Sequence, residues 1–343
     1  MNTDALCEVV QYNCNVADAR HAGNFTMCVY LMKMREYCRW DKGYLYTDSM
    51  TKEEVGEWVV DRECLWESLQ QAPFKPIEIN GQLYDPFDTD AINTQLQSRG
   101  MAYSGGVGNR CTPHFFLGRL AEQKFADECQ IVITSEECAR DLGSPPAMTL
   151  DNKIFIRKES IRRMLWEKLQ EWQWHKIKNA ASRAFSFYDF QGDLNAALDQ
   201  ITEVETEAII LHEQGEIKTN KLLGEQWKQM LVSISNARLE FRLRALKDFY
   251  ADAVTTLPAL FAENREASIH FYAANMNPLR KQLCPSFLDV YQAWCEQNDW
   301  QKMQAWINKA TEHWAETCRQ VLLLHDRYIN EAEIEKYLET RQL

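Results

Sequence analysis

The sequence lacks the short cysteine spacings that mark many metal and redox sites. None of its eleven cysteines belongs to a Cys-x-x-Cys pair, which argues against a zinc ribbon, a thioredoxin-like motif and a cysteine-ligated iron–sulfur cluster. An odd number of cysteines without an export signal is typical of reduced thiols in the cytosol. We therefore interpret the cysteines as small core residues.

Signals for export and for membrane insertion are also missing. The start of the chain, Met1-Asn2-Thr3-Asp4, has no basic segment followed by an apolar run, so it predicts no secretory signal. No apolar stretch approaches the length that spans a bilayer. We expect a cytoplasmic protein.

Familiar catalytic motifs are absent as well. The chain contains no Gly-x-Ser-x-Gly, no Gly-x-x-x-x-Gly-Lys-Ser/Thr and no kinase signature. A carboxylate di-iron bundle needs a glutamate three residues before a histidine. The residues three positions before the seven histidines are Asp18, Cys111, Trp172, Ile209, Ala267, Ala310 and Leu322. None is glutamate, so the standard di-iron motif is absent and no particular reaction is indicated.

Positive charge is scarce, with 38 basic against 50 acidic residues and a formal net charge of −12. A field of this sign repels nucleic-acid phosphates and anionic membrane surfaces. We therefore expect no nucleic-acid partner and no membrane partner. Hydrophobic residues make up 45% of the sequence, which is enough for a buried core, and a length of 343 residues favours two domains.

The pattern along the chain predicts an α+β fold that is mainly α. Residues 1–157 are expected to form a mixed domain with a small, largely antiparallel sheet. Its clearest signal is Asn80-Gly81, a preferred two-residue hairpin turn between two short apolar runs. Helices are expected over 20–40, 51–71 and 88–100, and strands over 101–104, 114–117, 130–134 and 153–156.

Residues 158–343 contain few helix breakers and predict a helical bundle domain. The expected helices cover about 158–184, 191–214, 219–250, 256–275, 279–297 and 299–328, with a short tail helix from Glu331. Helices that are joined by short connections pack antiparallel, so a bundle is the expected architecture.

One histidine of this bundle has carboxylates at helical spacing. His212 flanks an apolar stripe, with Glu205 one heptad earlier, Glu213 next in sequence and Glu216 at i+4. An imidazole and carboxylates that meet on a helix are the raw material of a metal or acid–base site. The predicted metal ligands are Glu205, His212, Glu213 and Glu216.

Alternatives stay open for this group. The small residues Ala208 and Gly215 lie on the same side as His212 and leave space for a ligand or for a second helix. If Gly215 ends the helix, Glu216 leaves the shared face. A partly buried histidine beside solvated glutamates is the other interpretation, because glutamates are common on helix surfaces.

Four further residues are candidates for binding a cofactor. His175 lies beside the apolar stripe of its helix, and His325 lies on the apolar face of its helix. The alternative to cofactor binding is that each is a core histidine with its hydrogen bonds satisfied. Arg110 and His114 belong to or follow the glycine-rich segment 104–110. This segment precedes a strand rather than a helix, so it predicts a wide hairpin loop instead of a nucleotide-binding loop.

Three phrases resemble those of an uncharacterised family of bacterial cytoplasmic proteins. They are Pro113-His114-Phe115-Phe116-Leu117-Gly118, Ala139-Arg140-Asp141-Leu142 with Pro145-Pro146-Ala147-Met148, and Ile210-Leu211-His212-Glu213 with Gly215-Glu216. The similarity runs over most of the chain. The resemblance implies one evolutionary unit, and no activity comes with it.

Two functions follow from these patterns. The first is a helical-bundle protein that binds a transition metal (iron, zinc or manganese) or a small cofactor through inward-facing histidine and glutamate residues. The alternative is a non-catalytic interaction protein, an adaptor or a homodimer, whose aromatic-rich helices form the contact surface. The partner is a small molecule in the first case and a protein in the second.

Overall fold

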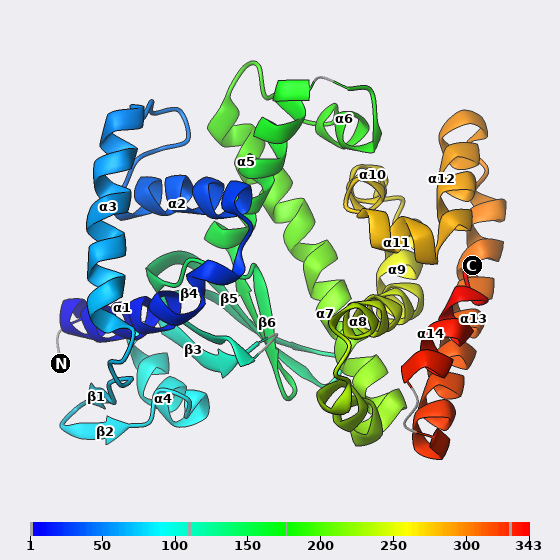
Figure 1. The fold of residues 1–343 in the computed structure, drawn as a ribbon. Helices are drawn as coiled ribbons and strands as arrows, with labels where there is room; N and C mark the ends of the chain where they lie inside the picture. The colour runs from blue at the N-terminus through cyan, green and yellow to red at the C-terminus, as the bar shows by residue number, and fades with distance from the viewer. Residues whose placement is uncertain (1–2, 109–110, 176, 329–330) are drawn as a thin grey trace. The chain divides into compact units, whose positions relative to one another are not determined.

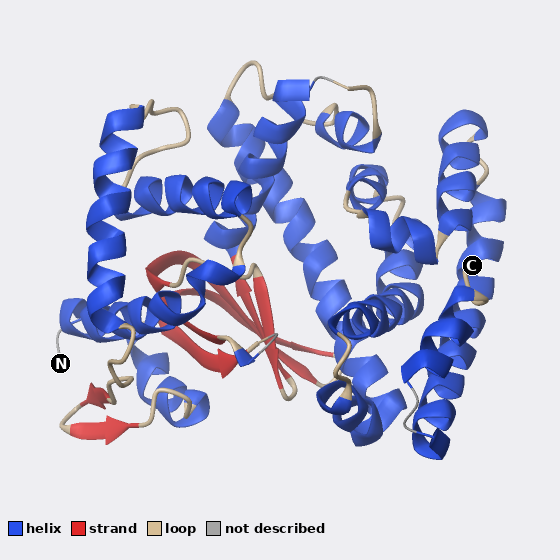
Figure 2. Ribbon diagram, in the orientation of Figure 1, coloured by secondary structure: helices blue, strands red, loops and turns tan. Residues whose placement is uncertain are grey.

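The computed structural model describes residues 3–108, 111–175, 177–328 and 331–343. Helices and strands are mixed in the first half of the chain, and all strands that the structure describes precede residue 158 (Figure 2). Helices follow from there to the end of the chain. The prediction of an α+β fold that is mainly α is therefore confirmed.

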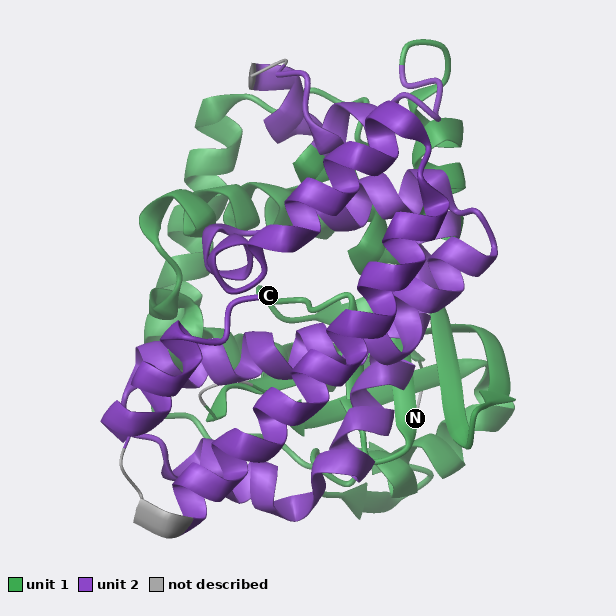
Figure 3. Ribbon diagram, turned by 90° about the vertical axis from the view of Figure 1, so that its right-hand side faces the viewer, with its two compact units in different colours: residues 1–168, 191–203 green, residues 169–190, 204–343 purple. Residues whose placement is uncertain are grey.

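Two compact units divide the chain (Figure 3). The mixed unit comprises Met1–Lys168 and Gln191–Glu203, and the helical unit comprises Leu169–Phe190 and Val204–Leu343. The chain crosses between the units three times: inside α5 (Lys158–His175), in the loop before α7 (Leu194–Ser233), and inside α7. Each unit has its own cluster of buried apolar side chains.

A five-stranded sheet organises the mixed unit. Its strands, in spatial order, are β3 (Met101–Val107), β4 (Pro113–Ala126), β5 (Cys129–Arg140), β7 (Lys153–Arg157) and β6 (Ala147–Leu150). Neighbouring strands are antiparallel except for β5 and β7, so the prediction of a small, largely antiparallel sheet is confirmed. The sequence analysis missed β6, because four residues are too few to show an alternating pattern.

A separate hairpin joins β1 (Ile77–Ile79) to β2 (Gln82–Tyr84). Asn80 and Gly81 form its turn with φ angles of 55° and 81°. A type I′ turn requires positive φ at both central residues, which asparagine and glycine adopt at little cost. The hairpin that was predicted from this dipeptide is confirmed.

The helices before the five-stranded sheet are α1 (Thr3–His21), α2 (Met27–Asp41), α3 (Lys52–Leu69) and α4 (Thr89–Leu96) (Figure 1). The expectation of one helix over 20–40 is wrong, because α1 ends at His21 and the 3-10 turn η1 (Ala22–Asn24) separates it from α2. Gly23 and Asn24 are poor helix formers. Because the apolar pattern continues across this break, the sequence does not indicate it.

Helix α1 packs against the sheet, and its contacts with β4 determine the position of its C-terminal turn. Leu6, Val10 and Cys14 are buried against Phe115 and Leu117 of β4. The Cys14 thiol also donates a hydrogen bond to the carbonyl oxygen of Phe115 at 3.2 Å. The last turn of α1 is thereby placed beside the start of β4.

The helical unit continues from the end of α5. Its helices after that point are α6 (Ala180–Phe185), α7, α8 (Ala237–Ala251), α9 (Leu257–Ala262), α10 (Glu266–Ala274), α11 (Pro278–Leu283), α12 (Pro285–Gln297), α13 (Trp300–Tyr328) and α14 (Glu331–Glu339). Phe249 and Trp314 stack in the core with ring centroids 5.1 Å apart. Among the described helices, none combines the length and the apolar character that a membrane crossing needs.

Helix α7 is longer than the sequence suggested. A break was expected between 214 and 219, followed by one helix over 219–250, but α7 runs through Gly215 to Ser233, and its non-helical residue is Gly224, with φ 70°. The break before α8 lies at residues 234–236, where none was expected. Gly215 lies where α7 meets α8: a Cβ atom there would be 2.6 Å from the carbonyl oxygen of Ala251. The glycine therefore allows close contact between two helices and does not end one.

A π-helical segment, η4 (Asp252–Thr256), connects α8 to α9. One extra residue per turn rotates the side chains that follow, and such segments occur often at functional sites. Asp252 and Thr256 are both buried. The next helix begins at Leu257 with Pro258 in its first turn, where proline is tolerated.

Replacing Gly215 with alanine tests this helix contact. We expect the Gly215→Ala variant to lose about 1–3 kcal/mol of unfolding free energy, because the new methyl group forces α7 away from α8. The matched control is Gly56→Ala in α3, where a Cβ atom meets no other atom within 4 Å. That variant should gain about 0.5–1 kcal/mol. Urea unfolding followed by circular dichroism measures both, and equal stabilities would contradict the close contact.

Candidate metal centre

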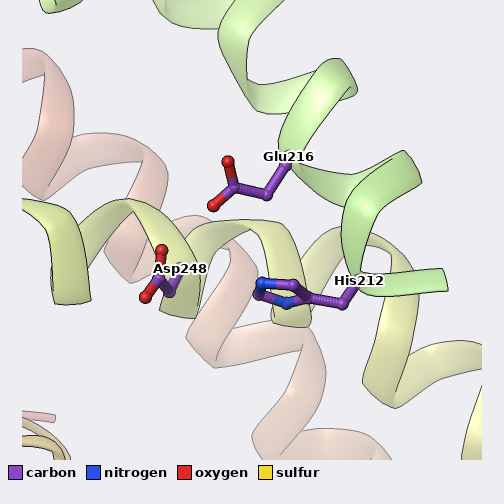
Figure 4. A group of neighbouring side chains, drawn as sticks. All are labelled: His212, Glu216 and Asp248. Atoms are coloured by element: carbon purple, nitrogen blue, oxygen red, sulfur yellow. The ribbon is translucent and has the colours of Figure 1, made fainter. Parts of the chain in front are cut away.

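Three side chains with metal-binding donors meet in the helical unit. His212 and Glu216 come from α7, one helical turn apart, and Asp248 comes from α8 (Figure 4). One donor atom of each lies within 4.8 Å of the donor atoms of the other two. Figure 4 shows the imidazole and the two carboxylates directed toward one space between the helices.

Asp252 orients the imidazole of His212. Its Oδ1 lies 2.7 Å from His212 Nδ1, and its side chain is only 2% exposed. The carboxylate also accepts hydrogen bonds from Arg280 at 2.5 Å, from the Tyr272 hydroxyl at 3.0 Å and from the Thr256 hydroxyl at 3.2 Å. A carboxylate bound to Nδ1 favours the tautomer in which Nε2 carries the lone pair.

A lysine balances part of the negative charge of the group. Lys247, the residue before Asp248, forms an ion pair with Glu216 Oε2 at 2.7 Å and donates to Asn220 Oδ1 at 3.1 Å. The positive charge of Lys247 therefore neutralises part of the negative charge of Glu216. The side chain of His212 is 31% exposed, so water and ions have access to the imidazole.

The surroundings shift the pKa values of all three donor groups. Burial acts to lower the pKa of His212, but Asp252, with Glu213 and Asp248, raises it to about 10. Burial and the nearby charge of Glu216 raise the pKa of Asp248 to about 7. Burial acts to raise the pKa of Glu216, but Lys247 and His212 lower it below its usual value.

The raised pKa values of His212 and Asp248 keep protons on the group near neutral pH. Near neutral pH His212 is an imidazolium, and Asp248 carries a proton for part of the time. Metal ligands must be deprotonated, so a divalent ion that binds here displaces those protons. One imidazole and two carboxylates suit iron, zinc or manganese, and three protein ligands leave a coordination position for water.

The structure separates the four residues that the sequence grouped as metal ligands. His212 and Glu216 come together, because α7 continues through Gly215. Glu205 lies elsewhere in the unit, is 4% exposed and accepts a hydrogen bond from Ser268 at 2.7 Å. Glu213 acts on His212 through its charge and does not belong to the group of three donors.

Two residues of the site were missed by the sequence analysis. Asp248 and Asp252 lie on α8 and η4, 36 and 40 residues after His212. Their spacing of four residues was the only local signal, since it places two carboxylates on one helix face. Nothing in the sequence indicates that this face meets His212.

Two of the four candidate cofactor residues, His114 and His325, have side chains that the structure describes. His325 is on α13, and its Nε2 lies 2.9 Å from the Ser233 hydroxyl. His175 is the last residue of α5, and its side chain is outside the described part of the structure, as is Arg110. His114 is at the start of β4, where its Nδ1 lies 3.2 Å from Asp141 Oδ2. Of the two with described side chains, His114 belongs to the mixed unit and His325 to the helical unit.

Fold and site together define a mainly helical α+β protein with a carboxylate-rich histidine centre. The model of the N-terminal domain of DUF6866, a family of unknown function, matches residues 5–157, and the model of its C-terminal domain matches residues 162–341. The chain belongs to the DUF6866 family, which confirms the resemblance to an uncharacterised family. No curated protein and no solved structure matches the chain significantly.

Replacing Asp252 with asparagine tests the electrostatic description. Asp252 is the main cause that raises the pKa of His212, and burial opposes it. In Asp252→Asn the pKa of His212 should therefore fall from about 10 by several units, as measured by NMR titration of the imidazole protons. The pKa of His313, to which Asp252 does not contribute, is the internal control. A pKa of His212 that stays near 10 would contradict the role of Asp252.

Proposed function

We propose that this protein binds a divalent transition-metal ion, iron, zinc or manganese, through His212, Glu216 and Asp248. The observation that carries the proposal is an imidazole, fixed at Nδ1 by the buried carboxylate of Asp252, that faces two carboxylates from two helices. Histidine ligands of metals usually donate their other N–H group to a carboxylate in this way.

Charge supports the same proposal. Two carboxylate ligands neutralise a divalent cation, and a neutral imidazole adds no charge. Without a metal, the raised pKa values of His212 and Asp248 keep protons at the site. Replacing those protons by one M²⁺ ion satisfies the same carboxylates. When bound, such a metal polarises a ligand or lowers the pKa of a bound water molecule.

The helix contacts make the site rigid. Arg280 on α11 and Tyr272 on α10 both bind Asp252, so elements distant in sequence hold the residue that orients His212. Rigid donors restrict the coordination geometry, which favours selective binding of a metal. The protein is expected to prefer transition metals to Mg²⁺ and Ca²⁺, because imidazole is a poor ligand for those hard cations.

The alternative, a protein that acts as an adaptor or homodimer, has less support from the helical unit. Trp227, Trp294, Trp306 and Trp314 are buried and stabilise the core, so these four rings are not offered to a partner. Trp174, Phe187 and Phe241 of this unit are exposed. We also propose a cytoplasmic location: none of the eleven cysteines, all within the described residues, forms a disulfide bond.

Metal titration of purified protein tests the proposal. After removal of metals with a chelator, the protein should take up one equivalent of Zn²⁺ or Mn²⁺, measured by elemental analysis after desalting. His212→Ala should abolish uptake, and Glu216→Gln or Asp248→Asn should weaken affinity about 10–100-fold or more, as losses of metal-site interactions do. The matched control is Glu213→Gln, next to His212 but outside the donor group; it removes a nearby charge without removing a ligand, so it should lose much less affinity than Glu216→Gln.

Two results would overturn this assignment. One is a wild-type protein that binds no transition metal at micromolar concentration. The other is equal loss of affinity in Glu213→Gln and Glu216→Gln, which would show a diffuse charge effect in place of coordination. Circular dichroism of each variant separates loss of the site from loss of the fold.

The pH dependence of binding gives a second prediction. The pKa of His212 is about 10, so between pH 7 and 9 one proton leaves His212 for each metal bound, and the affinity should rise about tenfold per pH unit. Below pH 7 the proton on Asp248 must also leave, so the slope should approach about hundredfold per unit. Calorimetry in buffers of different ionisation enthalpy counts the protons; binding that is independent of pH would contradict the site.

A further inference from the structure

A second candidate site lies in the mixed unit, around a cavity of about 260 Å³. The C-terminal turn of α1, the turn η1, the start of β4 and the loop after β5 line it. The lining includes Asp18, His21, Phe25, Thr112, His114 and Gly143. The volume is somewhat below that of pockets for drug-sized ligands, about 300–1,000 Å³. The cavity therefore suits a small molecule.

The imidazole of His114 is held by a buried carboxylate. His114 Nδ1 lies 3.2 Å from Asp141 Oδ2. Asp141 accepts hydrogen bonds from the backbone N–H groups of Phe115 at 3.2 Å and Ser144 at 2.5 Å. Burial acts to raise the pKa of Asp141, but the hydrogen bond and charge of His114 hold it well below its usual value. The carboxylate is thus ionised and favours the tautomer of His114 with a basic Nε2.

Two glycines fix the position of the His114 ring. A Cβ atom at Gly108 would lie 2.9 Å from Cδ2 of the ring, and one at Gly143 would lie 3.0 Å from Cε1. Neither glycine has the positive φ that would require a glycine for conformational reasons. Their role is to let the backbone approach the imidazole closely, which positions the side chain before any ligand binds.

A second imidazole, His21, lines the same cavity. Burial lowers its pKa, and the charges of Arg20 and His114 lower it further, so His21 is neutral near pH 7. Asp18, one turn earlier on α1, accepts the N–H of Leu142 with both carboxylate oxygens, at 2.9 and 3.0 Å. Burial, with the charge of Asp141, raises the pKa of Asp18 well above its usual value.

The residues that line the cavity limit the kinds of ligand that it can bind. No lysine or arginine is among the described lining residues, and the negative charge of Asp141, which contacts His114, disfavours an anion. Alanine, phenylalanine and proline side chains make up much of the wall, which suits an uncharged ligand. Thr112 supplies the only hydroxyl and no cysteine or serine lines the described cavity. If His114 acts as a base, the nucleophile that it activates is therefore water.

We propose that His114, positioned by Asp141, is the general base of a hydrolytic site for small uncharged esters. Nε2 of His114 takes a proton from water while the water oxygen forms a bond to the ester carbonyl carbon. The bond from that carbon to the alcohol oxygen then breaks. The proton passes from His114 to the leaving oxygen, so ester and water give acid and alcohol, and the imidazole returns to its starting state.

This activity is independent of the metal centre, because its residues belong to the mixed unit and those of the metal centre to the helical unit. Hydrolysis of 4-nitrophenyl acetate, followed by absorbance of the released nitrophenolate, tests it with the full-length protein after treatment with a chelator. We expect saturable hydrolysis over many turnovers, with no acetyl group retained on the protein by mass spectrometry. The rate should rise with pH, because a general base acts in its unprotonated form.

Three variants and one control make the test decisive. His114→Gln should lower kcat/KM at least about 100-fold, the usual contribution of a general base. Asp141→Asn, in which an amide replaces the orienting carboxylate, should lower kcat more than it changes KM, because the positioning residue does not touch the ester. Gly143→Ala should also lower kcat by displacing the ring. His313→Gln in the helical unit should behave as the wild type.

Several outcomes would overturn the proposed hydrolytic role of His114. A rate that is linear in ester concentration and equal to that of free imidazole at the same concentration would overturn the proposal. So would a folded His114→Gln protein that keeps the wild-type rate. If His114→Gln does not fold, as judged by circular dichroism, Gly143→Ala decides the matter: an unchanged rate and pH profile in that variant would refute the role of His114.

Discussion

The packing of the helical unit around its candidate site depends on the hydrogen bonds and ion pairs that compensate the buried carboxylate of Asp252. An isolated charge in this position would cost several kcal/mol, yet Asp252 is 2% exposed and surrounded by His212, Arg280, Tyr272 and Thr256. Its four partners come from different parts of the chain, so the carboxylate joins α7, α10, α11 and η4. The same contacts that satisfy the charge also fix the imidazole that faces Glu216 and Asp248.

Both candidate sites use the same physical device. In each, a buried aspartate binds Nδ1 of a histidine: Asp252 with His212 at 2.7 Å, and Asp141 with His114 at 3.2 Å. Their surroundings make them different. His212 faces two more carboxylates, which favour a cation, whereas His114 faces a small, largely apolar cavity with a second imidazole. We therefore propose that the same pair of residues serves metal binding in one unit and proton transfer in the other.

The fold could be predicted where the signal was local. Asn80-Gly81 determines its own turn, and the apolar runs of the longer strands are visible in the sequence. Helix ends were less accessible, because a glycine has opposite roles in different contexts. Gly215 was a plausible helix end, but it serves the contact with Ala251; Gly224 carries the non-helical φ. The difference between the two is set by the neighbouring helix.

By itself the sequence determined that His212 and Glu216 share a helix face, since 3.6 residues per turn place i and i+4 together. It also determined the excess of acid and the absence of familiar catalytic motifs. Only the tertiary structure decided that Asp248 and Asp252 complete this group, that Glu205 does not belong to it, and that Asp141 holds His114. The reason is physical: helical spacing is a property of neighbouring residues, whereas the meeting of two elements depends on which surfaces of the whole chain pack together.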